Sequence, residues 1–191
     1  MPEAPNIGDN STPLLIENRP NMTIRKIIYL PDPRLRLVSS PVTTFDDELQ
    51  TLIEDMFDTM YDANGVGLAA PQIGINLQLS VVDVIGDKTQ QLVLINPEII
   101  STDGEIEYQE GCLSVPGAFD TVIRAHKVTI KALDRTGSPF EMSAEGLLAE
   151  CFQHEIDHLN GKLFVDLLSP MKRAMARKKV DKYKRQQDKK S

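Results

Sequence analysis

Apolar residues recur every three or four positions in three stretches of the chain, and this spacing predicts amphipathic helices. The first stretch follows Thr44, which can cap a helix, and it ends near Ala63, just before the dipeptide Asn64-Gly65. Its apolar stripe consists of Leu49, Leu52, Ile53, Met56, Phe57, Met60 and Tyr61. We therefore expect one face of this helix to pack on a core.

The second stretch begins at Ser143, a suitable N-cap, and ends at Asn160-Gly161. Its apolar residues are Leu147, Leu148, Cys151, Phe152 and Leu159. The third stretch opens at Pro170, which fits the first turn of a helix. Its apolar residues are Met171, Ala174, Met175 and Val180, and we expect them to dock the first turns on the body of the protein.

Short stretches rich in β-branched and aromatic residues lie between these helices and are bounded by Gly, Pro, Asn or Asp, as is typical of strands. We expect strands at residues 23–30, 77–85, 91–95, 105–109, 121–134 and 139–142. Together these elements predict an α+β fold. Antiparallel or mixed sheets would pack around a central helix at 143–160, with an N-terminal helix before it and a C-terminal helix after it.

The central helix contains the sequence His154-Glu155-Ile156-Asp157-His158. Residues four apart lie on one face of an α-helix, so the two imidazoles can converge on one metal ion with Glu155 beside them. Such a pentad is typical of metallohydrolases, in which the carboxylate moves a proton of the activated water. A helix that has two histidines by chance is the alternative, so further ligands must decide between the two.

A hydrolytic zinc or iron site usually has three protein ligands. No glutamate follows Glu155, and Phe164 stands where one class of protease has its third histidine. Two cysteines remain. Cys151 lies on the histidine face, but it is roughly 10 Å along the helix from His158, too far for one metal ion. Cys112 follows a strand end and can approach from another segment, so Cys151 is best interpreted as a small core residue.

The segment from Gly65 to Gln72 has the sequence Gly-Val-Gly-Leu-Ala-Ala-Pro-Gln. Closely spaced glycines after a helix indicate backbone that another group approaches closely, although a glycine-rich helix end and loop would give the same pattern. No Lys-Ser or Lys-Thr pair follows, which argues against a phosphate-binding P-loop.

Three segments together resemble the peptide deformylases, in the order in which that family has them. They are Gly65–Gln72, the stretch from Glu110 to Ser114 (Glu-Gly-Cys-Leu-Ser) and His154–His158. The resemblance covers about residues 23 to 170 and is closest to the bacterial type that ends in a long helix. It implies that Cys112, His154 and His158 bind one divalent metal ion, most often ferrous iron, with zinc, nickel or cobalt as alternatives.

The resemblance also implies the reaction. The formyl group of N-formylmethionine at the start of a nascent polypeptide is removed as formate, and Glu155 is the general base and acid for a metal-bound water that attacks the formyl carbon. A bound divalent ion lowers the pKa of its water toward about 7, which fits that role. Gln72 and the backbone amide of Leu113 would stabilise the oxyanion.

The family's substrate slot gives further expectations. The resemblance places five residues at the substrate: Val66, Gly67, Glu110, Gly111 and Leu147. Phe119 departs from some members, which have arginine there to contact later residues of the substrate. Arg124 is present and is expected to pair with Glu110, although a surface arginine on a strand would look the same.

Composition narrows the class of protein. A chain of 191 residues with 41% hydrophobic residues can bury one substantial core. Two cysteines give no disulfide framework and favour a reducing compartment, while no run of 18 apolar residues predicts a membrane span. The first residues fit neither a secretory signal nor an organelle presequence. Composition therefore predicts an intracellular enzyme with one domain, and together with the resemblance it leads us to expect a monomer in the bacterial cytoplasm.

Charge divides the chain into a body and a tail. Residues 170–191 hold ten Lys or Arg and two Asp, a net charge of +8, against −15 for residues 1–169. We expect residues 1–22 to be a disordered extension, 23–170 the catalytic domain, and 171–191 a basic C-terminal helix and tail. A basic segment can be merely solvated, but the resemblance implies that it attaches the enzyme to the ribosome through RNA phosphates.

Two other functions fit part of the sequence. A small metallopeptidase would use the same pentad, but the third ligand of the common protease types is missing. A non-enzymatic metal-stabilised binding module would not need Glu155 beside its ligands, because a structural site usually fills all four positions with protein atoms.

Overall fold

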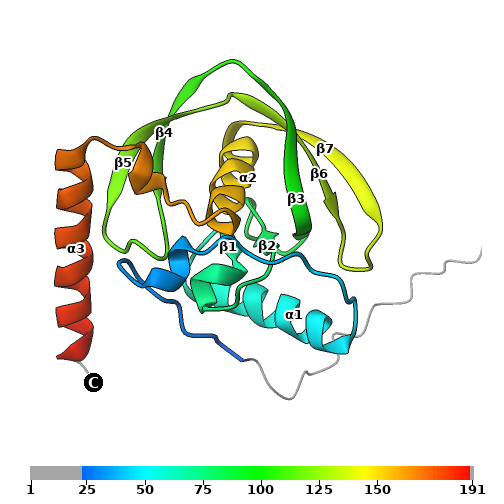
Figure 1. The fold of residues 1–191 in the computed structure, drawn as a ribbon, viewed down its shortest axis with the longest axis horizontal. Helices are drawn as coiled ribbons and strands as arrows, with labels where there is room; N and C mark the ends of the chain where they lie inside the picture. The colour runs from blue at the N-terminus through cyan, green and yellow to red at the C-terminus, as the bar shows by residue number, and fades with distance from the viewer. Residues whose placement is uncertain (1–22, 190–191) are drawn as a thin grey trace, which may run out of the picture.

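The computed structural model describes residues 23–189, so the expected extension at 1–22 lies outside the described residues. In this part of the chain one five-stranded antiparallel sheet and a two-stranded hairpin surround a central helix (Figure 1). The α+β prediction is confirmed. No helix among residues 23–189 is long and apolar enough to cross a lipid bilayer.

The larger sheet has the strand order β1-β2-β3-β6-β7. These strands are Gly67–Ala69, Leu79–Val82, Leu92–Asp103, Lys127–Leu133 and Pro139–Glu145. The second sheet pairs β4 (Ile106–Gly111) with β5 (Phe119–Arg124), and Gly111 lies opposite Phe119. Short 3-10 turns at Pro33–Arg36, Ala70–Ile73 and Phe164–Leu167 connect the larger elements.

Two strand predictions were wrong. The expected strand at 121–134 is two strands, because the chain turns at Ala125 and His126 between β5 and β6 and so moves from one sheet to the other. Residues 23–30 form no strand, although the Ile28 and Leu30 amides donate to the carbonyls of Gln72 and Ser114 at 2.8 and 2.9 Å. These two hydrogen bonds hold the segment in an extended conformation, but they do not form the repeating backbone pairing of a β-sheet.

Helix α1 (Asp47–Asp62) buries its apolar stripe against β1 and β2. Its N-cap is Asp46, whose Oδ1 accepts from the Leu49 amide at 3.0 Å, so the expected cap at Thr44 was wrong by two residues. Arg25 forms an ion pair with Asp55 of this helix at 2.6 Å, and its amide donates to the Thr59 hydroxyl. These contacts attach the N-terminal segment to α1.

Helix α2 (Gly146–Leu159) passes between the two sheets (Figure 1). Strand β7 leads directly into it through Gly146, whose φ of 62° is easy only for glycine. Ser143 was expected to cap this helix, but it belongs to β7 and its hydroxyl bonds that of Thr129 across the sheet at 2.8 Å. The cap residue is Glu145, and its side chain makes no capping bond.

Helix α3 (Pro170–Asp188) packs beside β5 and the turn at Phe164–Leu167. Its buried residues are Ala176 and Val180, whereas Met171 and Met175 are 71% and 54% exposed. The predicted docking face was therefore wrong apart from Val180. The reason is that the helix turns a narrower face, of small and β-branched residues, toward the core beneath it.

Candidate functional site

The two histidines of α2 face the loop that joins β4 to β5. His158 is 1% exposed, and its Nε2 lies 3.2 Å from the Sγ of Cys112, which directly follows β4. Ligand atoms of Cys112, His154 and His158 all lie within 4.8 Å of one another. The fold thus brings together three residues that lie up to 46 positions apart in sequence.

This donor set fits a metal ion. A thiolate with two imidazoles suits zinc, iron, nickel or cobalt and leaves a coordination position open for a small molecule. Burial lowers the pKa of His158, and a neutral imidazole is the form that binds metal. Cys151, by contrast, is 4% exposed and its thiol faces the carbonyl of Val66 at 3.7 Å, as a core residue would.

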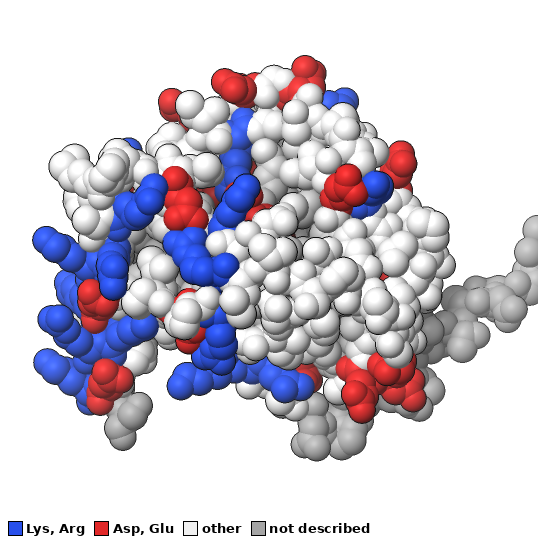
Figure 2. Space-filling model, viewed as in Figure 1, with Lys and Arg blue, Asp and Glu red and all other residues white. Residues whose placement is uncertain are grey.

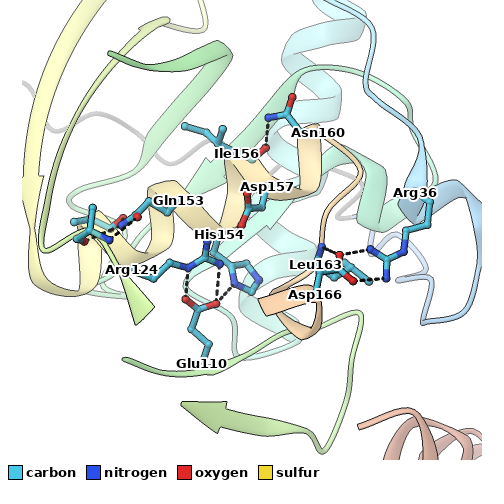
Figure 3. Close-up of polar contacts among 12 residues, drawn as sticks. Arg36, Glu110, Arg124, Gln153, His154, Ile156, Asp157, Asn160, Leu163 and Asp166 are labelled. Atoms are coloured by element: carbon cyan, nitrogen blue, oxygen red, sulfur yellow. Dashed lines mark hydrogen bonds and ion pairs between the residues drawn. The ribbon is translucent and has the colours of Figure 1, made fainter. Parts of the chain in front are cut away.

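Behind the histidines lies a buried ion-pair network (Figure 3). The Nδ1 of His154 lies 2.9 Å from the Oε2 of Glu110, whose two oxygens also accept from Nε and Nη2 of Arg124 at 2.6 and 3.1 Å. Arg124 extends the network to Asp157, with a 2.6 Å bond from Nη1. The expected pairing of Arg124 with Glu110 is confirmed.

Burial alone would raise the pKa of Glu110, but His154 and Arg124 together hold it below its usual value. Glu110 is therefore an anion that accepts from the Nδ1–H of His154, which leaves the Nε2 lone pair directed toward Cys112. The sequence placed Glu110 at the substrate, but the structure places it beneath the histidine and away from the pocket wall. Asp157, its indirect partner, was not singled out, although it lies within the pentad.

A pocket of about 480 Å³ opens beside this cluster. Four of the five residues expected at the substrate are in its wall: Val66, Gly67, Gly111 and Leu147. Gln72, Cys112, Leu113, His154 and Glu155 also line it, so the three sequence segments meet at one cavity. Glu150, Tyr29 and Tyr183 line it too, and no motif in the sequence points to them.

Glu155 is buried at 3% exposure, and its Oε2 has no hydrogen-bond partner among the described residues. Burial raises its pKa to about 7, with His154 lowering and Glu110 raising it. A cation bound to the nearby ligands would lower this pKa again. A Cβ added to Gly67 would lie 2.4 Å from the Oε1 of Glu155 and 2.8 Å from the Sγ of Cys151, so β1 can approach this carboxylate only with glycine there.

The side-chain amide of Gln72 is fixed at the other side of the pocket. Its Oε1 accepts from the Ala69 amide at 2.8 Å, and its Nε2 therefore lies toward Ser114 and Cys112, 3.3 and 3.6 Å from Oγ and Sγ. Gln72 is 1% exposed. Leu113 follows Cys112 in the turn that closes this side.

Comparison with known proteins agrees with this site. Residues 24–174 match the family described as polypeptide deformylase. The peptide deformylases of Cellvibrio japonicus and Pseudomonas aeruginosa are 55% and 56% identical to this chain, over 84% and 87% of it and 96% and 99% of their own lengths.

Solved structures show the same fold. A peptide deformylase from Legionella pneumophila is 71% identical, with a TM-score of 0.86 over 87% of this chain and 98% of that one. One from Synechococcus elongatus in complex with actinonin is 46% identical, with a TM-score of 0.77 over 83% of this chain and 87% of that one. The chain therefore belongs to the peptide deformylase family, the metal-dependent hydrolases that remove the formyl group from the N-terminus of nascent peptides.

Proposed function

We propose that Cys112, His154 and His158 hold the catalytic metal ion and that Glu155 is the general base and acid of deformylation. The convergence of these three donors on one side of the pocket, with the unpartnered Glu155 carboxylate beside them, carries this assignment. A bound divalent ion supplies Lewis-acid activation of water at neutral pH. By its resemblance to the bacterial enzymes, the native ion is ferrous iron, which metal analysis of anaerobically purified protein would test.

Glu155 is suited to moving a proton in both directions. Its Oε2 is buried and has no partner in the described part of the chain, so a proton bound there is not shared with another protein group. A carboxyl group whose pKa lies near the working pH both accepts and releases a proton readily. Glu155 would first take a proton from the attacking water and then give it to the amine that leaves with the peptide.

Gln72 and the backbone amide of Leu113 would stabilise the oxyanion that forms at the formyl group. The bond from the Ala69 amide to Oε1 fixes the orientation of the Gln72 amide, so its Nε2 points along the pocket wall beside Cys112. A fixed neutral donor is well suited to a transient negative charge, and one such donor contributes about 2.7–4 kcal/mol to catalysis.

The methionine side chain of the substrate would lie against Val66, Gly67, Gly111 and Leu147. Val66 and Leu147 are 40% and 48% exposed, so apolar surface on the pocket wall is available for an apolar ligand. Gly111 packs under the ring of Phe119, which an added Cβ would meet at 2.4 Å. Glu110 would act by orienting His154 and would not contact the peptide itself.

The division into a catalytic domain at 23–170 and a basic C-terminal element at 171–191 is part of the proposal. Figure 2 shows Lys and Arg gathered over α3. The exposed members are Lys172, Arg173, Arg177, Lys178, Lys179, Lys182 and Arg185. We propose that this surface binds ribosomal RNA phosphates. The free thiols of Cys112 and Cys151 fit the reducing cytoplasm of a bacterium, and the site lies within one chain, as a monomer requires.

Glu155→Gln tests the catalytic assignment. Formate release from formyl-Met-Ala-Ser should be nearly abolished while bound metal and folding are kept, because the ligand atoms are untouched. Wild-type protein should leave an unformylated Met-Ala-Ser peptide uncut, which separates deformylation from peptidase activity. Loss of the metal together with the activity would give Glu155 a structural role and defeat the assignment.

Substitutions that remove positive charge from α3 test the proposed binding to ribosomes. Replacing Lys178, Lys179 and Lys182 with Gln should weaken co-sedimentation with ribosomes and reduce its dependence on salt, since each phosphate contact contributes roughly 0.7–0.9 to the slope of log K against log salt. The matched control replaces Lys88, Lys127 and Lys131, which are exposed outside α3. Equal effects in the two variants would assign the interaction to net charge alone.

A further inference from the structure

The active-site pocket continues past the catalytic residues as far as helix α3. Tyr183 of α3 and Tyr29 of the N-terminal segment line the same cavity as His154 and Glu155. Their rings meet edge to face, with centroids 5.5 Å apart and planes at 77°, the arrangement that aromatic pairs prefer. Phe119 lines the cavity too and is 63% exposed. Three segments far apart in sequence thus build an aromatic outer wall.

Core packing and one hydrogen bond hold helix α3 in the position where Tyr183 lines the pocket. Val180, one turn before Tyr183, is fully buried, and Ala176 is 5% exposed in the same cluster as Leu30 and Val115. The Nζ of Lys184 donates to the carbonyl of Tyr29 at 3.4 Å, next to the ring contact. One face of α3 is therefore docked as far as Lys184, whereas residues 185–189 are exposed.

We infer that Tyr183 is a substrate-positioning residue, which with Tyr29 and Phe119 forms an outer subsite for an apolar or aromatic third residue of the formylated peptide. This inference rests on the proposed function, which places formylmethionine at the inner end of the pocket. An extended peptide advances about 3.3–3.6 Å per residue, so the residues after methionine must pass along the outer wall. That wall presents aromatic rings, which favour an apolar or aromatic side chain over an acidic one.

The hydroxyl group of Tyr29 remains neutral at the pH at which the enzyme works. Burial and the adjacent Tyr183 raise the pKa of Tyr29 to about 12. A neutral phenol can donate a hydrogen bond to a carbonyl of the peptide while its ring packs on a side chain. Helix α3 then has two functional faces: lysines and arginines point outward, and Tyr183 points to the pocket.

Substrate length tests this inference. We compare formyl-Met-Ala with formyl-Met-Ala-Phe, using wild-type protein, Tyr183→Ala, Tyr183→Leu and Tyr183→Phe. For the tripeptide, Tyr183→Ala should raise KM about 3–10-fold with kcat unchanged, Tyr183→Leu should raise it less, and Tyr183→Phe should stay within twofold. For the dipeptide, which ends before the subsite, all four proteins should have equal KM. The matched control is Gln186→Ala, an exposed change on the same helix.

The outcomes separate the inference from its premise. Equal changes of KM for both substrates in Tyr183→Ala and Tyr183→Leu, or no change for either, would overturn the outer subsite. Far-UV circular dichroism and dipeptide kcat show whether α3 and the site remain folded in each variant. If wild-type protein releases formate from neither substrate, the proposed function has failed, irrespective of Tyr183.

Discussion

Replacing Glu110 with Gln should weaken metal binding without removing any ligand. In the folded protein the Glu110 side chain is fully buried, and both of its carboxylate oxygens accept hydrogen bonds. Arg124 donates to them at 2.6 and 3.1 Å, and the Nδ1 of His154 lies 2.9 Å from Oε2. Gln has the same shape but only one acceptor oxygen. Either His154 or Arg124 must then lose its hydrogen-bond acceptor, because the NH2 group of the glutamine side chain would face one of these buried donors in place of an oxygen.

The size of the effect follows from these contacts. Loss of the carboxylate that orients a metal-ligating histidine typically costs 10–100-fold in metal affinity, so we expect a decrease of about that size. Breaking a buried ion pair from one side costs about 3–5 kcal/mol. Because Arg124 keeps Asp157 at 2.6 Å, we expect the free energy of unfolding to fall by the lower end of that range, about 3 kcal/mol.

Metal affinity is measured by competition with a chelator for Co²⁺, and stability by urea unfolding of the metal-loaded proteins. Asp157→Asn is the matched control, because it removes the other carboxylate bonded to Arg124, and that carboxylate is itself 23% exposed. It should lower stability but leave metal affinity within about threefold, well short of the effect of losing the histidine's own partner. Equal loss of metal affinity in both variants would refute orientation of His154 by Glu110 and leave general loosening of the fold as the cause.

Four further substitutions test other parts of the structure. Cys112→Ser should lose most bound metal, whereas Cys151→Ala should keep it and lower the unfolding free energy by on the order of 1–2 kcal/mol; equal metal loss would contradict the assignment. Gln72→Leu should lower kcat for formyl-Met-Ala-Ser by roughly 10²–10³, and a change in KM alone would argue against an oxyanion donor. Burial raises the pKa of Asp83, but the Tyr61 hydroxyl at 2.6 Å and three backbone amides outweigh it and lower that pKa overall. The stability that comes from a lowered carboxyl pKa is present above the unfolded pKa near 3.9 and is lost as pH falls through the folded pKa. Asp83→Asn should therefore lower the unfolding free energy by about 2 kcal/mol at pH 7 and by progressively less below about pH 4. A difference that does not change with pH would contradict this.

The parts of the fold that could be predicted from sequence are those that a local pattern determines. The stripe of α1 and the pentad of α2 each have a period that only a helix satisfies, and the structure has helices at both places. Cys112 was placed at a strand end running into a turn, where β4 ends at Gly111. The geometry of one helix was also enough to exclude Cys151 as a metal ligand and so to place it in the core, because a rise of 1.5 Å per residue keeps it too far from His158 to share a metal ion.

What could not be predicted depends on partners distant in sequence. Ser143 is a residue type that often caps helices, but it pairs with β6 as part of strand β7. Tertiary pairing thus overrides the local capping signal. The strand break at His126 is set by the change of sheet, which no local period encodes. Glu110 has no sequence feature to separate a substrate contact from a contact beneath His154. The orientation of α3 likewise follows from the core under Val180, which forms only in the folded chain.

The close approach of β1 to Glu155 limits how this enzyme can become resistant to inhibitors. Substitutions that narrow a pocket are a common way to exclude a bound compound, but any side chain at Gly67 would collide with the Glu155 carboxylate and the Cys151 sulfur. A variant that blocked a compound there would displace the group proposed to move the proton. The rings of Phe119 and Tyr183, by contrast, can change without touching Glu155. A compound held by the Gly67 backbone should therefore select fewer viable escape variants than one held by the outer aromatic wall.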